Sequence, residues 1–216
     1  MNQLCENQDI AETLLQTLGD GNWVPFGTTS SSRPAIDVNP TLLEKYLGDL
    51  LSTLLTALDS RSRHMRQARN NIGPIFLLNN ISYLRREILS SQIGDLLGEQ
   101  AEDDLNKRNR IAKTSYMELF SGLISCLMDA QDHGGLLKSA VHHGSGEKRD
   151  AKDRLGRFND ALLEVENVHR VARLDAGEDE MRDRLKGEVD KMVIPTFSKF
   201  VARNEASVSK SGFFPW

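Results

Sequence analysis

The chain has 216 residues, of which 27 are basic and 31 acidic, so its formal net charge is −4. This near balance excludes a general polyanion-binding protein, and any contact with nucleic acid or lipid must be local. Only 6% of the residues are aromatic, whereas leucine and charged residues are abundant. Straight-chain residues lose little rotamer freedom in a helix, so this composition favours a helical protein.

Two cysteines, Cys5 and Cys126, are too few for a disulfide scaffold and favour a reducing, intracellular location. No apolar run approaches the roughly 20 residues that span a bilayer. Residues 1–12 carry acids but neither Lys nor Arg, which does not fit a signal or transit peptide. We therefore expect a soluble chain with at most peripheral membrane contact.

The first predicted helix is short and amphipathic and ends at Gly19, a good helix-stop residue. Its apolar residues are Leu4, Leu14, Leu15 and Leu18. Residues 19–38 are rich in Gly, Pro, Ser and Thr, which predicts a loop. Trp23, Val24 and Phe26 are expected to anchor one end of it.

The strongest helical periodicity covers residues 41–69, with Asn39 predicted as the N-cap and Pro40 as the first helical residue. Its main stripe consists of Leu43, Leu47, Leu50, Leu54 and Leu58, and Leu42, Tyr46, Leu51 and Leu55 widen it. Gly73-Pro74 then separates this helix from one with the stripe Leu77, Ile81, Leu84 and Ile88.

Gly94 and Gly98 interrupt the next pattern, and a third long helix is predicted from about Glu99. Its apolar face consists of Tyr116, Phe120, Leu123 and Leu127. Residues 131–146 form a predicted Gly- and His-rich linker. A fifth helix follows, with Leu155, Phe158, Leu162 and Val165 on its apolar face.

The sixth predicted helix has Met181, Leu185, Val189, Met192 and Thr196 on one face, and Pro195 should kink it. No run of alternating β-branched residues predicts a strand. The fold class is therefore all-α, an elongated helical bundle or rod. We predict a short helix and loop at 1–38, a helical domain at 39–203 and a tail at 204–216.

Signatures of catalytic and cofactor sites are absent from the sequence, because neither a phosphate-binding glycine loop nor an HExxH or CxxC motif occurs. His133, His142 and His143 lie in the linker, where a metal would lack a fixed third and fourth ligand. Glu164 and Glu166 are two residues apart on a helix, so they cannot form an acid–base pair. We expect neither a metal, nor a cofactor, nor an enzyme activity.

The cysteines give no sign of a nucleophile. Cys126 stands beside Leu127 on an apolar helix face and is predicted to be a small buried residue. Cys5 is predicted to be a free thiol.

Two basic clusters are the candidate binding residues. The first consists of Arg61, Arg63, Arg66 and Arg69, with His64 among them, and the second of Lys107, Arg108, Arg110 and Lys113. Favourable cations at a helix C-terminus explain the first cluster, and a solvated helix face explains the second. The alternative is contact with an anionic lipid or an acidic protein patch.

Four segments, in order, resemble a known family. Residues 75–84 read IFLLNNISYL, 152–160 KDRLGRFND, 179–185 DEMRDRL and 193–200 VIPTFSKF. They resemble the C-terminal region of the seventy-kilodalton subunit of the exocyst, the vesicle-tethering complex. The segments resemble fungal members of this family in particular. The resemblance covers about Asn39 to Val201.

This resemblance implies a helical rod of the tethering-complex type, which holds secretory vesicles at the plasma membrane before fusion. The implied partners are other exocyst subunits, a Rho-family GTPase and membranes containing phosphatidylinositol bisphosphate, but no nucleic acid. The implied location is cytoplasmic, peripheral to the plasma membrane at sites of polarised secretion such as a bud or hyphal tip.

The end of the chain departs from that family. There a last basic helix provides the main lipid contacts, whereas residues 204–216 here contain Lys210 as their one basic residue. We expect a fragment truncated at its C-terminus, whose lipid binding depends on the two basic clusters. The competing hypothesis is a generic helical adaptor that is unrelated to secretion.

Overall fold

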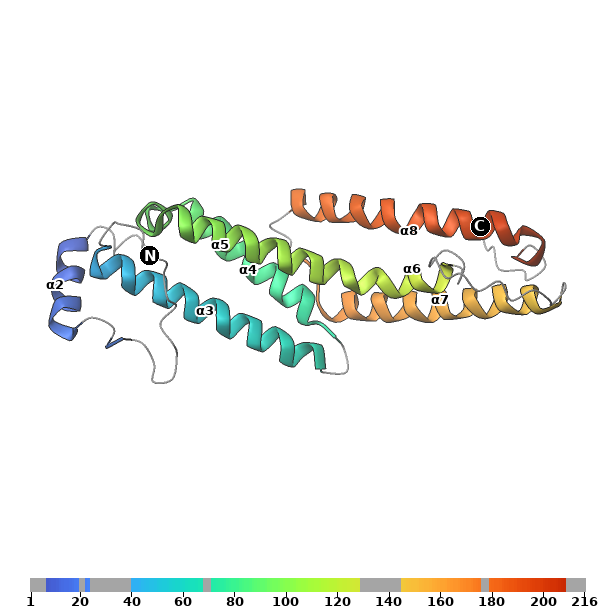
Figure 1. Cartoon of the computed structure of the whole chain (residues 1–216), viewed down its shortest axis with the longest axis horizontal. Helices are drawn as coiled ribbons and strands as arrows, with labels where there is room; N and C mark the ends of the chain where they lie inside the picture. The colour runs from blue at the N-terminus through green and yellow to red at the C-terminus, as the bar shows by residue number, and fades with distance from the viewer. Residues whose placement is uncertain are drawn as a thin grey trace, which may run out of the picture. The chain divides into compact units, whose positions relative to one another are not determined.

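The computed structural model describes residues 7–19, 22–23, 40–67, 71–128, 145–175 and 179–208. All regular elements in these ranges are helices, which confirms the all-α class (Figure 1). They are α2 (Gln8–Leu18), α3 (Leu42–Gln67), α4 (Gly73–Leu89), α5 (Gln92–Met117), the 3-10 turn η1 (Glu118–Phe120), α6 (Ser121–Leu127), α7 (Ser145–Val171) and α8 (Asp179–Val208). Within the described ranges, no helix combines the length and apolarity that crossing a membrane requires.

The chain divides into two compact units, residues 1–114 and 115–216. The division falls near the end of α5, where no composition change or loop marks it in the sequence. The boundaries proposed from the sequence, after residues 38 and 203, stay predictions.

The first unit packs α3 against α2 and α4, with α5 joined to α3 and α4 by side-chain bonds. α3 buries four leucines at a spacing of four residues: Leu43, Leu47, Leu51 and Leu55. The predicted stripe was therefore partly wrong, because Leu50 is 50% exposed and Leu54 40% exposed. At about 100° per residue, Leu50 and Leu54 lie only about 60° and 20° around the helix from Leu47, so the period alone does not tell which row is buried.

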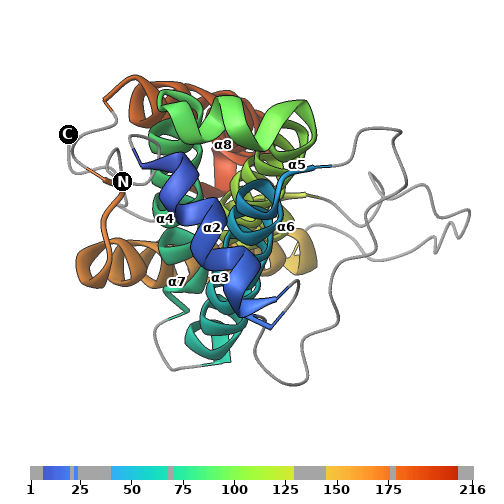
Figure 2. The ribbon, with the colours of Figure 1, turned by 90° about the vertical axis from the view of Figure 1, so that its left-hand side faces the viewer.

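Thr41 and Glu12 satisfy the first N–H groups of α3. Thr41 and Glu44 form a reciprocal capping box, with the Glu44 N–H 3.2 Å from Thr41 Oγ1 and the Thr41 N–H 3.1 Å from Glu44 Oε2. The ribbon of α2 runs across the N-terminal end of α3 (Figure 2). From α2, Glu12 accepts the N–H groups of Leu42 at 2.8 Å and Leu43 at 2.9 Å.

The predicted start of this helix was consequently wrong. α3 begins at Leu42, so Pro40 precedes it, and the capping residue is Thr41. The predicted cap Asn39 lies outside the described residues.

Replacing Glu12 by Ala is expected to lower the free energy of unfolding by about 1–2 kcal/mol, because two N–H groups of α3 lose a charged acceptor. Urea unfolding followed by circular dichroism measures the change. Gln16→Ala, on the exposed side of α2, is the control and should change stability by less than about 0.5 kcal/mol. Equal stabilities of the two variants would show that the Glu12 contacts contribute nothing.

Polar side chains fix the register of α4 and α5. Ser82 Oγ donates to Asn109 Oδ1 at 3.0 Å, and Arg85 Nε donates to Asn106 Oδ1 at 2.6 Å. The predicted interruption before Glu99 is confirmed: Gly98 has φ +70° and ψ −175°, a conformation that glycine adopts at little cost.

The second unit packs α6 against α7 and α8. Its core contains Phe120, Leu123, Leu127, Ala151, Phe158, Val168, Leu185 and Phe200. The predicted face of α7 was wrong at Leu162, which is 45% exposed, whereas Arg154 is buried on the same side as Phe158. α8 passes through Pro195 with helical backbone angles, and its non-helical residue is Asn204 (φ −115°, ψ 17°).

Candidate functional site

The first basic cluster lies in the last two turns of α3. Arg61, Arg63 and Arg66 are exposed, and Arg69 lies outside the described residues. At about 100° per residue, Arg61 and Arg63 point to nearly opposite sides of the helix. Between them, Ser62 is buried and its Oγ donates to the Gly73 carbonyl at 2.9 Å. The arginines therefore surround the end of the helix and do not form one flat basic face.

The four residues of the second cluster also differ in their surroundings. Arg108 Nη1 lies 2.6 Å from Asp59 Oδ2 of α3, so this arginine ties two helices of its unit together. Lys107 and Arg110 are exposed, and Lys113 is half-buried. Because residues three apart share a helix face, Lys107, Arg110 and Lys113 lie along one side of α5.

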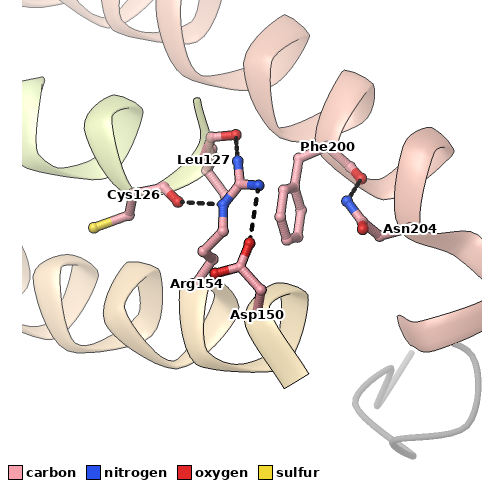
Figure 3. A network of polar contacts seen from close by, with 6 residues as sticks. All are labelled: Cys126, Leu127, Asp150, Arg154, Phe200 and Asn204. Carbon is pink, nitrogen blue, oxygen red and sulfur yellow. Dashed lines mark hydrogen bonds and ion pairs between the residues drawn. The ribbon is translucent and has the colours of Figure 1, made fainter. Parts of the chain in front are cut away.

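Outside the two basic clusters, Arg154 of α7 is buried in the second unit, with only 8% of its surface exposed. Figure 3 shows its surroundings. Its Nε donates to the Cys126 carbonyl at 3.3 Å and its Nη2 to the Leu127 carbonyl. The guanidinium carbon lies 5.1 Å from the centre of the Phe200 ring, and Nη1 lies 3.8 Å from the Asp150 carboxylate. One side chain therefore caps the C-terminus of α6 and joins it to α8.

The burial and capping role of Arg154 were not predicted from the sequence, although a signal was present. Ala151, Arg154 and Phe158 follow the i, i+3, i+7 spacing of one helix face. A cation inside an apolar row predicts a buried, hydrogen-bonded side chain, since an unpaired buried charge is strongly unfavourable.

An aromatic cluster surrounds His169. Tyr116 and Phe120 meet edge to face with their ring centres 5.5 Å apart, and the Tyr116 ring lies 5.7 Å from the imidazole. The Tyr116 hydroxyl is 3.0 Å from His169 Nε2, and His169 Nδ1 is 2.8 Å from the Val165 carbonyl. A carbonyl oxygen can only accept, so Nδ1 donates to it, and in the neutral imidazole Nε2 accepts a hydrogen bond from the Tyr116 hydroxyl.

Burial raises the pKa of Tyr116 from 10.0 to about 12. The folded state therefore holds the phenol proton more tightly than the unfolded state, and this stabilising contribution is present below pH 10 and is lost as the pH rises towards 12. Tyr116→Phe should show a smaller decrease in melting temperature over this pH interval than the parent chain. Parallel curves of melting temperature against pH for the two chains would contradict this prediction. The control is Tyr83→Phe, which changes a half-exposed tyrosine and should leave the curve parallel to that of the parent chain.

The remaining residues predicted as candidates either lie outside the described residues or form no site within them. His133, His142, His143 and Cys5 lie outside the described residues. Cys126 is half-buried rather than buried, because α6 turns only part of this side towards its neighbours. In the described part of the chain, no three His, Cys, Asp or Glu residues are grouped as metal ligands.

Comparison with known proteins identifies the family. The family that represents the C-terminal region of the Exo70 subunit in the exocyst complex matches residues 1–213, which extends beyond the motif resemblance at both ends. The chain is 24% identical over 212 residues to the "Exocyst complex protein exo70" of Neurospora crassa, covering 87% of this chain and 32% of that protein.

Two further relatives show similar coverage. The "Exocyst complex protein EXO70" of Yarrowia lipolytica is 22% identical over 177 residues, which are 78% of this chain and 29% of that protein. The "Exocyst complex component EXO70A1" of Arabidopsis thaliana is 26% identical over 166 residues, 71% and 24% of the two chains. The chain thus spans between 24% and 32% of the length of these relatives. Because the family match covers nearly every residue and agrees with the four motifs, this chain belongs to the family of the Exo70 exocyst subunit and matches its C-terminal region.

Proposed function

We propose that this chain acts as part of an exocyst subunit, in the tethering of secretory vesicles at the plasma membrane before fusion. The observation that supports this proposal is the family match over residues 1–213. The proposed location is the cytoplasmic side of the plasma membrane, at sites of polarised secretion.

Exposed apolar residues on helices suit such a role, because they provide surface for contacts with other helical proteins. On α2 they are Ile10, Leu14 and Leu18, which are 52–65% exposed and share one face at a spacing of four residues. On α7, Leu162 and Leu163 are exposed as well. The proposed partners are other exocyst subunits and a Rho-family GTPase.

The test is affinity purification of the tagged chain from its own cells, with the recovered proteins identified by mass spectrometry. Other exocyst subunits should be enriched with the parent chain, and less with a variant carrying Ile10→Ser, Leu14→Ser and Leu18→Ser. A matched variant with Thr13→Ala and Gln16→Ala, exposed on the same helix, should keep them. A folded chain that recovers no exocyst subunit would favour the alternative, a helical adaptor unrelated to secretion.

For an anionic membrane containing phosphatidylinositol bisphosphate, we propose contact through the exposed cations of the two basic clusters. Each Lys or Arg near such a surface contributes about 1 kcal/mol, so four give weak, salt-sensitive attachment. Arg108 is less suited to this role than its neighbours, because it already pairs with Asp59.

The combined change of Arg61, Arg63, Lys107 and Arg110 to Ala is therefore expected to reduce co-sedimentation with phosphatidylinositol bisphosphate vesicles by at least about tenfold at low salt. These four side chains are exposed, so the fold should persist. The control removes four exposed cations of the other unit, Arg149, Lys152, Arg157 and Lys186. Equal losses in both variants would indicate a net-charge effect, and no loss would exclude the clusters as the lipid site.

A further inference from the structure

A pocket of about 230 Å³ lies between the end of α6 and two turns of α8, entirely within the second unit. Its base is apolar, since Leu127 and Phe200 are buried there. Further lining residues are Ile124, Met128, Pro195 and Thr196, together with the exposed cations Lys199 and Arg203.

The size of this pocket suits one aromatic side chain. An apolar cavity of about 150 Å³ accommodates a benzene molecule, whereas pockets for drug-sized ligands begin at about 300 Å³. The space between α6 and α8 lies between these two values.

The charges around the pocket also favour an aromatic occupant. Lys199 and Arg203 are four residues apart and therefore lie on the same side of α8. A cation beside an aromatic face is attracted by the ring quadrupole, most strongly for tryptophan. The Arg154 guanidinium already makes such a contact with Phe200, one of the residues of this pocket (Figure 3).

The chain itself carries aromatic residues just beyond α8. Residues 209–216 read SKSGFFPW: a polar segment of four residues followed by Phe213, Phe214 and Trp216. They lie outside the described residues. Even as a straight helix, the stretch from Arg203 to the end of α8 at Val208 would advance only about 7.5 Å, whereas residues 209–213 can span up to about 17 Å. Phe213 and the residues after it can therefore reach back to the pocket.

We propose that the segment Phe213–Trp216 docks into the pocket between α6 and α8, with one aromatic ring against Phe200 and beside Lys199 and Arg203. The short polar spacer keeps the aromatic residues at a high effective concentration near the pocket, which favours this segment over a separate molecule. The docked segment covers the apolar base of the pocket. This proposal does not depend on the proposed role in tethering.

Thiol accessibility in the full chain tests this docking. Thr196→Cys places a thiol in the pocket, in a background where Cys5 and Cys126 are changed to Ser. Substituting Phe213, Phe214 and Trp216 together by Ser is expected to accelerate modification of this thiol by at least about fivefold. The control thiol, Lys186→Cys on an exposed part of α8, should react at the same rate with either tail. Equal rates at residue 196 would overturn the proposal.

A photoreactive amino acid at position 214 identifies the residues that the tail contacts. Cross-links within one chain to residues 124–128 or 195–203 are expected. A product with twice the mass of the chain would show that the tail of a second copy occupies the pocket. That result, or cross-links confined to other residues, would overturn the proposal.

Discussion

Replacing Arg154 by Met is expected to lower the free energy of unfolding by about 3 kcal/mol, among the largest effects of any single substitution in the second unit. The guanidinium donates to the carbonyls of Cys126 and Leu127, which are the last groups of the short helix α6. Methionine keeps the unbranched stem but leaves these carbonyls without their charged donor. It also removes the cation that lies over the Phe200 ring.

Two further variants separate these contributions from general effects of the substitution. Arg154→Lys retains the positive charge but not the planar fork that reaches two carbonyls, so it should recover only part of the loss. Arg157→Met removes an exposed cation one turn along α7 and should change stability by less than about 0.5 kcal/mol. Urea unfolding followed by circular dichroism measures all three. If Arg154→Met were as stable as Arg157→Met, the buried contacts would contribute nothing.

The helices could be predicted from the sequence because their signals are local. Gly19 ends α2, Gly98 interrupts α5, and the leucine period covers α3. The first residue of α3 was predicted wrongly, although Thr41 and Glu44 form a capping box whose T-x-x-E spacing is visible in the sequence. Only the further contact from Glu12, thirty residues before Leu42, has no local signal. A contact between distant residues leaves no local pattern.

The buried faces could be predicted only in part. On α3 the leucines occupy more than half of the circumference, and packing against α2 and α4 selects the row of Leu47 and Leu51. On α7 the apolar Leu162 is exposed while Arg154 is buried, because the end of α6 offers carbonyls to a donor and not an apolar surface. Hydrophobicity alone ranks these two residues in the wrong order.

The candidate site shows the same limit. The positions of Lys and Arg in the sequence predicted both basic clusters, but they did not distinguish Arg108 from Lys107 as a candidate contact residue. Only the fold shows that Arg108 pairs with Asp59, 49 residues away in the sequence. The family, by contrast, could be predicted from the sequence, because four short segments resemble the family's motifs and occur in the same order.

Gly73→Ala is expected to destabilise the first unit by about 2–3 kcal/mol, even though alanine is the better helix former. A Cβ atom at Gly73 would lie 2.2 Å from the Ser62 carbonyl oxygen and 2.9 Å from Arg66 Cγ. The nearest of these atoms belongs to the α3 backbone, so the clash cannot be relieved by turning a side chain. The start of α4 must move away from α3, which also strains the bond from Ser62 Oγ to the Gly73 carbonyl.

The same substitution at Gly156 is the matched control, and it should have the opposite sign. Gly156 lies inside α7, and a Cβ atom there meets nothing within 4 Å. Alanine at Gly156 should therefore stabilise the protein by about 0.5–1 kcal/mol, through helix propensity and the reduced freedom of the unfolded chain. A stabilising Gly73→Ala would show that α4 can withdraw from Ser62 without loss. Opposite signs would show that close approach of the α3 and α4 backbones, and not helix propensity, requires glycine at position 73.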